Sequence, residues 1–237
     1  MIGIVVPAHN EEALLGVCLA SLSAAAVHPG LHGEAVQIVV VLDDCSDGSA
    51  AVVAQAALAS ASNSGAPAIT SVQVACRQVG TARAAGAARL LDAGARWLAF
   101  TDADTRVTPD WLVQQLALGV DVVCGTVAVD DWSPHAAHGP QLEAHFYRTY
   151  TDRDGHRHIH GANLGVSASA YRSAGGFAPV ACHEDVLLVA ALERIRARFA
   201  WSAAPRVVTS ARTDARARGG FGDTMVAIVA GDFARSA

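Results

Sequence analysis

Acidic residues follow two apolar segments that have the composition of buried strands. Asp43 and Asp44 follow VQIVVVL, and Asp102 and Asp104 lie directly after the apolar LAFT. Neighbouring carboxylates repel each other and are costly to desolvate, so they persist where a cation or hydrogen-bond donors compensate their charge. Mg²⁺ suits such a place, because it binds one or two protein carboxylates and completes its shell with water and phosphate oxygens. The D-x-D spacing of Asp102 and Asp104 therefore predicts a site for a divalent cation.

The elements that must position these acids alternate between short β-branched runs and Ala/Leu-rich helical stretches, which is typical of βαβ units around a mostly parallel sheet. We predict strands over 2–6, 36–42, 69–75, 96–101, 120–129 and 205–212. We predict helices over 11–26, from the end of DDCSDGSA to about 61, and over 81–94, 109–119 and 184–199, and a strand, short helix and turn within 163–177. Asn10 is the predicted N-cap of the first helix. Ligands of such sheets bind beyond the carboxyl ends of the strands, where these acids lie.

Composition narrows the class of protein. With 237 residues, 52% of them hydrophobic and 16% charged, the chain can bury a core, and we expect one α/β domain without an internal linker. A net charge of −5 without a basic run argues against nucleic acid as a partner. No segment has the apolar length of a transmembrane span, and the N-terminus lacks the features of a signal peptide. Five scattered cysteines without a C-x-x-C pair predict reduced thiols and a cytoplasmic location.

The region after residue 129 departs from this alternation and is rich in aromatic residues and histidine. His156, His158 and His160 alternate, so an extended segment would align them on one face. They could ligate a metal, or form a polar edge that contacts a substrate, which we favour for at least one of them. Nearby aromatic side chains could bind a sugar or lipid, or pack in the core, as we expect for Phe146.

Five segments, in order, resemble the motifs of family 2 glycosyltransferases, which have the GT-A fold. They are IVVPAHNEEALLGVCLASL, VVVLDDCSDGSA, GTARAAGAARL, LAFTDADTRVTPDWL and GGFAPVACHEDVLLVAALE, and together they extend over most of the chain. The resemblance implies a Rossmann-like, mixed and mostly parallel sheet flanked by helices. It also implies an inverting enzyme that needs Mg²⁺ or Mn²⁺ and moves a sugar from a nucleotide-sugar donor to an acceptor hydroxyl. We expect residues 1–129 to bind the donor and 130–237 to bind the acceptor and carry the catalytic base.

The resemblance also assigns roles to residues of the matching motifs. Asp104, with Asp102, would hold the metal, and Asp185 would be the general base. The expected nucleotide-binding residues are Pro7, His9, Glu11, Asp44, Arg83 and Asp102. His9 stands where the family usually has tyrosine and could stack on the base, for which we favour uridine. Glu184 is expected to orient the site or cap its helix.

His160, from the alternating histidines, and Glu184 could contact the acceptor or the diphosphate, and so could two further groups. His183 lies beside the expected base, and either touches substrate or only packs and caps. The Arg-rich stretch from 210 to 220 contains Arg212 and Arg218, which could bind phosphate oxygens in a mobile loop or lie solvated. The C-terminal segment after it is moderately amphipathic, so peripheral contact with a membrane and a lipid-linked acceptor stay open.

Two other functions compete with glycosyl transfer. Nucleotidyl transfer also uses Mg²⁺ at acidic strand ends, but it calls for a Gly-rich basic loop after the first strand, where this chain has the acidic PAHNEE. A catalytically silent nucleotide-binding scaffold would keep the fold without turnover. The sequence leaves the donor sugar, the acceptor and the oligomeric state open.

Overall fold

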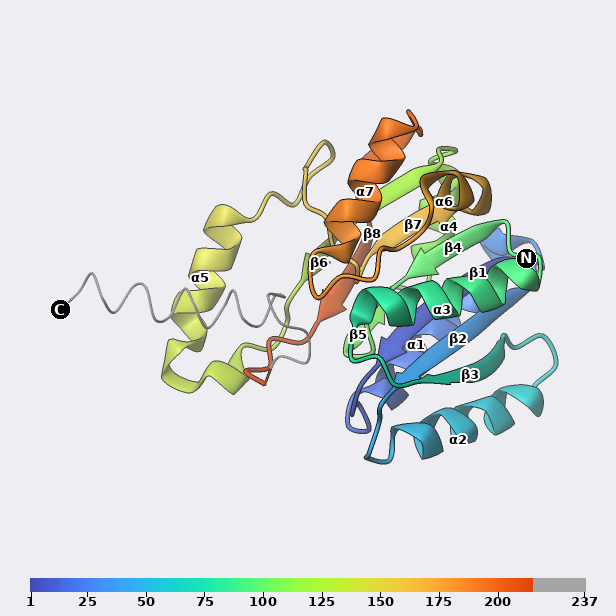
Figure 1. Cartoon of the computed structure of the whole chain (residues 1–237). Helices are drawn as coiled ribbons and strands as arrows, with labels where there is room; N and C mark the ends of the chain where they lie inside the picture. Colours follow the sequence, from blue (N-terminus) through green and yellow to red (C-terminus); the bar gives the residue numbers. More distant parts are fainter. Residues whose placement is uncertain (215–237) are drawn as a thin grey trace.

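A single sheet forms the centre of the computed structural model, which describes residues 1–214 (Figure 1). Its strands are β1 (Ile2–Ala8), β2 (Val36–Asp43), β3 (Ala68–Val74), β4 (Trp97–Phe100), β5 (Thr105–Val107), β6 (Val122–Ala128), β7 (Leu164–Ser167) and β8 (Phe199–Thr209). Their order across the sheet is β3-β2-β1-β4-β7-β6-β8-β5. The first four along the chain are parallel neighbours, whereas β7 is antiparallel to both β4 and β6, and β5 is antiparallel to β8. The predicted mixed, mostly parallel sheet is confirmed.

Helices other than α5 cover both faces of this sheet. The helices of the described chain are α1 (Leu15–Ala26), α2 (Ser49–Ala61), α3 (Val79–Asp92), α4 (Trp111–Ala117), α5 (Gly139–Thr149), α6 (Ala168–Ala174) and α7 (Glu184–Arg194), with short 3-10 turns at Pro29–Leu31 and Ser133–His138. One hydrophobic cluster joins α1, α2 and α4 to the first face, and a second joins α3, α6 and α7 to the other. The described chain is therefore a three-layer α/β domain.

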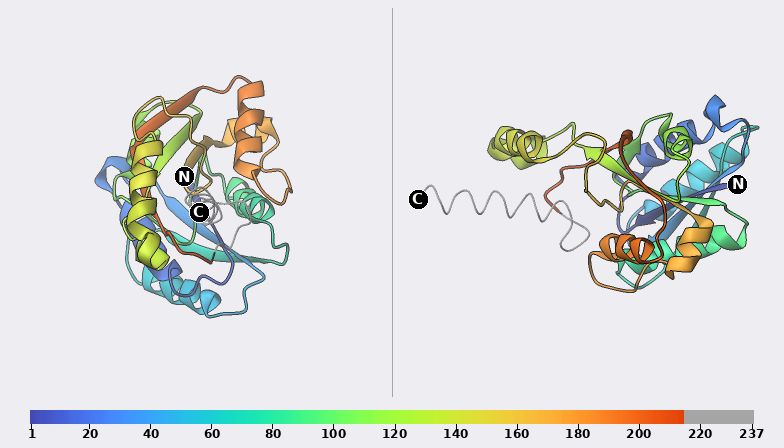
Figure 2. Two further views of the ribbon diagram at one scale, coloured as in Figure 1. Left: turned by 90° about the vertical axis from the view of Figure 1, so that its left-hand side faces the viewer. Right: turned by 90° about the horizontal axis from the view of Figure 1, so that it is seen from above.

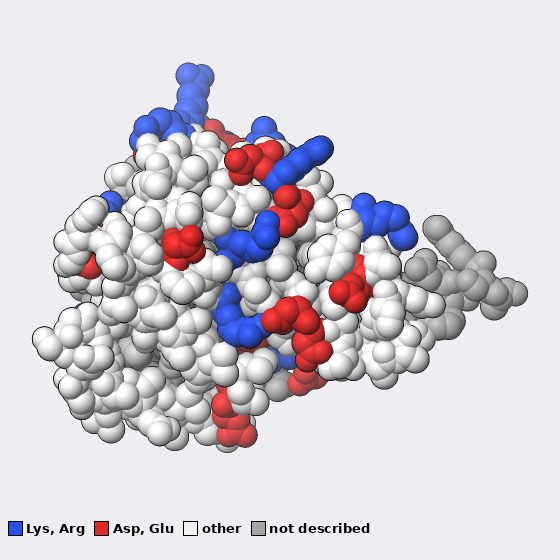
Figure 3. Space-filling view, turned by 180° about the vertical axis from the view of Figure 1, so that it is seen from behind, with Lys and Arg blue, Asp and Glu red and all other residues white. Residues whose placement is uncertain are grey.

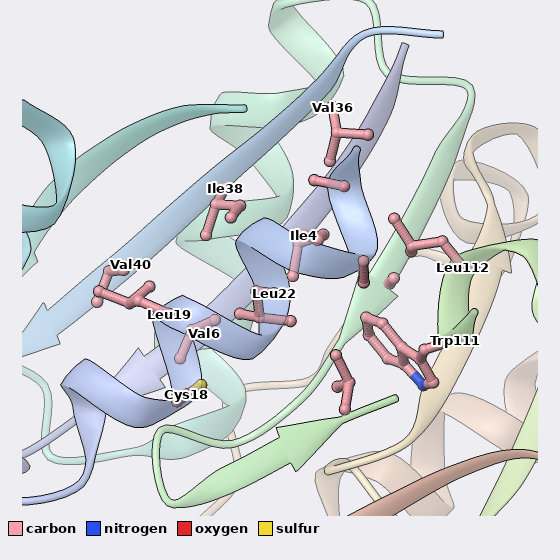
Figure 4. Packing of buried hydrophobic residues seen from close by; sticks show 14 of the residues in the cluster. Ile4, Val6, Cys18, Leu19, Leu22, Val36, Ile38, Val40, Trp111 and Leu112 are labelled. Atoms are coloured by element: carbon pink, nitrogen blue, oxygen red, sulfur yellow. The ribbon is translucent and has the colours of Figure 1, made fainter. Parts of the chain in front are cut away.

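Alternation along the central strands builds both clusters. In β1, the side chains of Ile2, Ile4 and Val6 lie in the first cluster and that of Val5 lies in the second. Figure 4 shows Ile4 and Val6 packed with residues of α1, β2 and α4. Every residue of β1 except Pro7 is buried, which explains why this strand is a continuous apolar run rather than an alternating one.

Three predicted boundaries are wrong by four or more residues, and two elements were not predicted. The first helix begins at Leu15, four residues late, because Asn10 has a positive φ of 55° and accepts a hydrogen bond from Ser46 N in the next loop instead of capping a helix. The helix predicted over 184–199 ends at Arg194, and the strand predicted over 205–212 is β8, which already begins at Phe199 and ends at Thr209. The strand β5 and the helix α5 were not predicted. In Figures 1 and 2, α5 stands away from the sheet, on the side toward which β1 and β2 point.

Several charged side chains of the described surface form ion pairs with side chains of opposite charge. Arg96 pairs with Glu34, and Arg198 pairs with Asp121. Figure 3 shows acidic and basic groups interspersed on one face, with wide uncharged areas between them. None of the helices within residues 1–214 combines the length and the apolar character that crossing a bilayer requires.

Candidate active site

The two acids of the D-x-D motif lie in the short turn between β4 and β5. The backbone carbonyl of Asp102 accepts hydrogen bonds from Thr105 N at 3.1 Å and from the Cys18 thiol at 3.4 Å, which fixes the turn against α1. The Asp104 side chain is only 14% exposed. Its burial and the charge of Asp102 raise the pKa of Asp104 to about 7, although the nearby Arg212 guanidinium lowers it. Asp104 is therefore a carboxylate whose charge a further cation would stabilise.

Arg83 joins this turn to the start of α7. The residue is 3% exposed on the buried side of α3, because the neighbouring Ala82 and Gly86 let α3 approach the sheet closely. One nitrogen of its guanidinium lies 2.5 Å from Asp102 Oδ1, and the other is hydrogen-bonded to Glu184. The charges of Asp102 and Glu184 hold the pKa of Arg83 above its ordinary value despite the opposing effect of burial. Two predicted site residues from distant motifs thus share one cation.

Asp185 occupies the first turn of α7 and is held by backbone donors. Its Oδ2 accepts a hydrogen bond from Gly161 N at 2.8 Å, and its Oδ1 accepts one from Val186 N at 2.8 Å. Gly161 has no room for a side chain, since a Cβ there would lie 2.4 Å from the Arg83 guanidinium. The 160–163 loop therefore packs between Arg83 and Asp185. The Asp185 carboxylate consequently has a defined orientation beside Arg83 and its partners Asp102 and Glu184.

Arg212 brings a third part of the chain to the D-x-D turn. Its guanidinium donates to both carboxylate oxygens of Glu11, at 2.8 and 2.5 Å, and lies 3.1 Å from Asp104 Oδ2. Glu11 is 5% exposed, and its backbone N donates to Ser49 Oγ at 2.8 Å. The two partners are 201 positions apart in sequence, so no local pattern could have revealed this ion pair.

The residues expected around the nucleoside lie at the carboxyl ends of β1 and β2. Pro7 is partly exposed in β1, and His9 Nδ1 lies 2.6 Å from the backbone oxygen of Asp43, which fixes its ring toward the end of β2. Asp44 is exposed, has a φ of 52°, and forms an exposed ion pair with Arg77 at 3.3 Å. The Asp44 carboxylate is therefore accessible to a ligand, as the prediction requires.

Asp43 has a structural part in this site that sequence reasoning missed. Its buried carboxylate accepts hydrogen bonds from the backbone N–H groups of Cys76, Arg77 and Gln78, at 2.8 to 3.1 Å. Burial by itself raises the pKa of Asp43, but the hydrogen bonds outweigh it and hold that pKa below its ordinary value. Asp43 thereby shapes the loop that leads into α3 and Arg83. Its place in a pair of acids at a strand end was the available signal.

The three alternating histidines form a packed, hydrogen-bonded stack with Tyr150. The rings of Tyr150 and His158 lie 4.1 Å apart at 9°, and His156 and His160 flank His158 at 5.5 and 5.9 Å. Their ring nitrogens contact the chain, and His160 Nε2 lies 3.0 Å from Tyr150 Oη. Burial and the neighbouring His158 lower the pKa of His160 to about 4. Within residues 1–214, no group of three or more His, Cys, Asp or Glu side chains is arranged to hold a metal.

His183 and Arg218 are the other residues expected to contact the acceptor or the diphosphate. His183 is exposed in a left-handed conformation, with a φ of 61°, directly before α7. Arg218 lies outside the described residues. All five cysteines belong to the described part of the chain, and they are free thiols.

Comparison with known proteins agrees with this architecture. TarS of S. aureus in complex with UDP-GlcNAc has a TM-score of 0.64 at 14% identity, covering 97% of this chain and 65% of TarS 1–349. The mannosyltransferase PcManGT from Pyrobaculum calidifontis, in complex with GDP-Man and Mn²⁺, has a TM-score of 0.63 at 19% identity, covering 91% and 58%. GalNAc-T7 with UDP, GalNAc and Mn²⁺ has a TM-score of 0.61 at 14% identity, covering 90% and 44%. The chain spans less than two thirds of each of these structures. These are GT-A glycosyltransferases, and the expected GT-A fold is confirmed.

The family model described as glycosyl transferase family 2 matches residues 3–174, well over half of the chain. No curated protein sequence matches significantly. The match contains the D-x-D turn and Arg83, whereas Asp185 and Arg212 lie beyond its end. This match, together with the GT-A fold, shows that the chain belongs to glycosyl transferase family 2.

Proposed function

We propose that this protein is a metal-dependent, inverting glycosyltransferase that moves a sugar from a nucleotide-sugar donor, for which we favour UDP, to an acceptor hydroxyl. One observation carries the proposal. The single guanidinium of Arg83 holds both Asp102 of the D-x-D turn and Glu184, the neighbour of Asp185. The acids expected to serve the leaving diphosphate and the acid expected to serve the acceptor therefore belong to one cluster.

The oxygen atoms that the D-x-D turn offers as ligands fit a hard divalent ion. Asp102 and Asp104 offer carboxylate oxygens, the ligands that Mg²⁺ and Mn²⁺ prefer, and two carboxylates leave room for water and phosphate oxygens. Asp104 is nearly buried beside Asp102, where added positive charge is favourable. A bound ion would supply charge neutralisation for the departing nucleoside diphosphate. The Mn²⁺ in the PcManGT and GalNAc-T7 structures supports the same assignment.

The nucleoside would lie against Pro7 and His9 at the end of β1. We propose that the accessible Asp44 accepts a hydrogen bond from the base, while Glu11 and Arg83 border the pocket. Both uracil and guanine carry ring N–H donors, and the TarS and PcManGT structures contain UDP-GlcNAc and GDP-Man. The preference for UDP is therefore the part of the proposal that a ligand panel must decide.

Asp185 is proposed to accept the proton of the acceptor hydroxyl as that oxygen attacks the sugar. Gly161 N and Val186 N each donate to one of its oxygens, which orients the carboxylate without neutralising it. A positioned base of this kind contributes ~10²–10⁴-fold to the rate. A direct displacement with one base inverts the anomeric centre. We propose that His160 and His183 contact the acceptor or the diphosphate. We also propose that residues 130–237 form the half of the chain that binds the acceptor.

A thermal-shift panel tests the proposal. We expect one of UDP, GDP or their sugar conjugates to raise the melting temperature in the presence of Mn²⁺, and to raise it less with EDTA, because a ligand selective for the folded state stabilises it by mass action. If no nucleotide stabilises the protein with Mn²⁺, the proposal is wrong. Asp185→Asn should keep the nucleotide-induced shift and lose most of the donor hydrolysis in which water replaces the acceptor.

A further inference from the structure

Arg212 is the last ionic partner that the described chain adds to the site. Arg212 follows β8, and its side chain is 18% exposed. Its guanidinium holds Glu11 through two hydrogen bonds and reaches Asp104 with the same nitrogen that contacts Glu11 Oε1. Thus one positive group lies between two carboxylates, one of which is the acid expected to bind the metal.

This arrangement supplies a charge that the site needs. Glu11 and Asp104 are nearly buried, and Asp102 stands two residues from Asp104. Buried carboxylates that face one another are costly without a cation. Arg212 provides that cation within the chain itself. A divalent ion on Asp104 would bring a second positive charge to the same oxygens, so the guanidinium and the ion would compete for Asp104.

A nucleoside diphosphate changes this competition. Its oxygens offer Arg212 a new anionic partner, and guanidinium groups bind phosphate in bidentate geometry. The Arg212 side chain is long and rotatable, whereas Glu11 is held by its backbone bond to Ser49. If Arg212 moves from Asp104 to the diphosphate, the Asp104 carboxylate becomes free to bind the divalent ion. This would happen when the nucleotide, which also binds the ion, enters the site.

We propose that Arg212 is the internal counter-ion of the donor site before substrate binds, and that it couples the binding of the metal to the binding of the nucleotide. The metal alone must displace Arg212 from Asp104, whereas the metal with a nucleoside diphosphate gives Arg212 another anion to hold. Each ligand then tightens the binding of the other by the same factor. This inference rests on the proposed function.

Isothermal titration of MnCl₂ tests the coupling, with and without saturating UDP or GDP, on the wild type, Arg212→Met, Arg212→Lys and the control Arg106→Met. Arg106 is an exposed arginine that pairs with Asp130 outside the site. We expect Arg212→Met to bind Mn²⁺ alone at least ~5-fold more tightly than the wild type does. We also expect the nucleotide to enhance Mn²⁺ binding by Arg212→Met at least ~5-fold less than it enhances binding by the wild type. A factor of ~5 lies at the lower end of measured coupling free energies. Arg212→Lys keeps the positive charge but cannot form the bidentate contact. Its affinity for Mn²⁺ alone and its enhancement by nucleotide should therefore lie between those of the wild type and Arg212→Met, while both values for Arg106→Met should match the wild type.

The outcomes separate the two hypotheses. If the wild type binds Mn²⁺ and nucleotide together and Arg212→Met binds Mn²⁺ alone no more tightly, the inference is wrong and the proposed function stands. The same conclusion follows if the enhancement by nucleotide is unchanged in both Arg212 variants. A wild type that binds neither nucleotide with Mn²⁺ refutes the proposed function and the inference with it. Thermal melts of both Arg212 variants identify a loss of folding, and Arg212→Lys keeps the test decisive if Arg212→Met unfolds.

Discussion

At the scale of single residues, the site depends on buried charges that satisfy one another. Arg83 is the clearest case, because its guanidinium serves Asp102 and Glu184 and lies against the Gly161 backbone. A buried ion pair adds little net stability, yet removal of one partner leaves an uncompensated charge. The residues that organise the site should therefore also affect stability strongly when they are changed one at a time.

Replacement of Arg83 by methionine should destabilise the protein by about 3–5 kcal/mol, because the buried Glu184 loses the cation that it shares with the partly exposed Asp102. Urea unfolding monitored by circular dichroism measures the change. Arg89→Met is the matched control, since Arg89 lies exposed on the same helix and should change the free energy of unfolding by no more than about 0.5 kcal/mol. Equal stability of the two variants would contradict the structural role of Arg83.

Asp43 predicts a dependence of stability on pH. Its pKa is lowered in the folded protein, below an unfolded value of about 3.9. Its ionisation therefore stabilises the fold above the unfolded value, and this stabilisation is lost as the pH falls through the folded pKa. Asp43→Asn should cost about 1–3 kcal/mol near neutral pH, and the difference from the wild type should shrink below about pH 4.

Urea unfolding at a series of pH values measures this difference. Asp44→Asn is the control, because the Asp44 carboxylate is exposed and its replacement should change stability little at any pH. A difference between the wild type and Asp43→Asn that is constant with pH would show that the Asp43 charge does not contribute.

At the scale of elements, periodicity predicted those that have a long apolar or Ala-rich run in their own sequence. The parallel strands and α3 have long apolar or Ala-rich patterns, and Gly94 and Gly119 follow their helices with φ values of 87° and 63°, as helix-ending glycines do. The strand β5 has only three residues and pairs with β8, about a hundred positions later. The helix α5 lies in a His-rich stretch, where its apolar side is narrow, with Leu142 and Phe146 as its buried large side chains. Such elements depend on tertiary contacts that a local pattern does not contain.

Tyr150 anchors the histidine-containing segment between α5 and β7 to the sheet. Its hydroxyl accepts a hydrogen bond from Val127 N in β6 at 2.9 Å and contacts His160 Nε2 at 3.0 Å. Tyr150→Phe leaves Val127 N without this acceptor and should cost about 1–3 kcal/mol in urea unfolding. Tyr147→Phe is the control, because Tyr147 is 63% exposed on α5. If both variants unfold alike, the Tyr150 hydroxyl does not hold this region to the sheet.

At the scale of the whole molecule, the fold gathers motifs from both halves of the chain at one edge of the sheet. Sequence reasoning could predict that Asp102 and Asp104 lie at this edge, because parallel strands end together. It could not predict that Arg83 joins Asp102 to Glu184, or that Arg212 reaches Glu11, since both contacts depend on how α3, α7 and the segment after β8 pack. The chemical groups were visible in the sequence, and their pairing was not.

The central claim is that Asp104 belongs to a metal-dependent nucleotide site. Titration calorimetry of UDP and GDP with Mn²⁺, on the wild type, Asp104→Asn and Asp92→Asn, tests it most directly. Asp92 is an exposed acid at the last residue of α3, away from the D-x-D turn. We expect Asp104→Asn to weaken Mn²⁺-dependent binding at least ~10-fold, the loss expected when about 1.4 kcal/mol of binding energy is removed, with Asp92→Asn unchanged. Binding by Asp104→Asn that is as tight and as metal-dependent as that of the wild type would contradict the account.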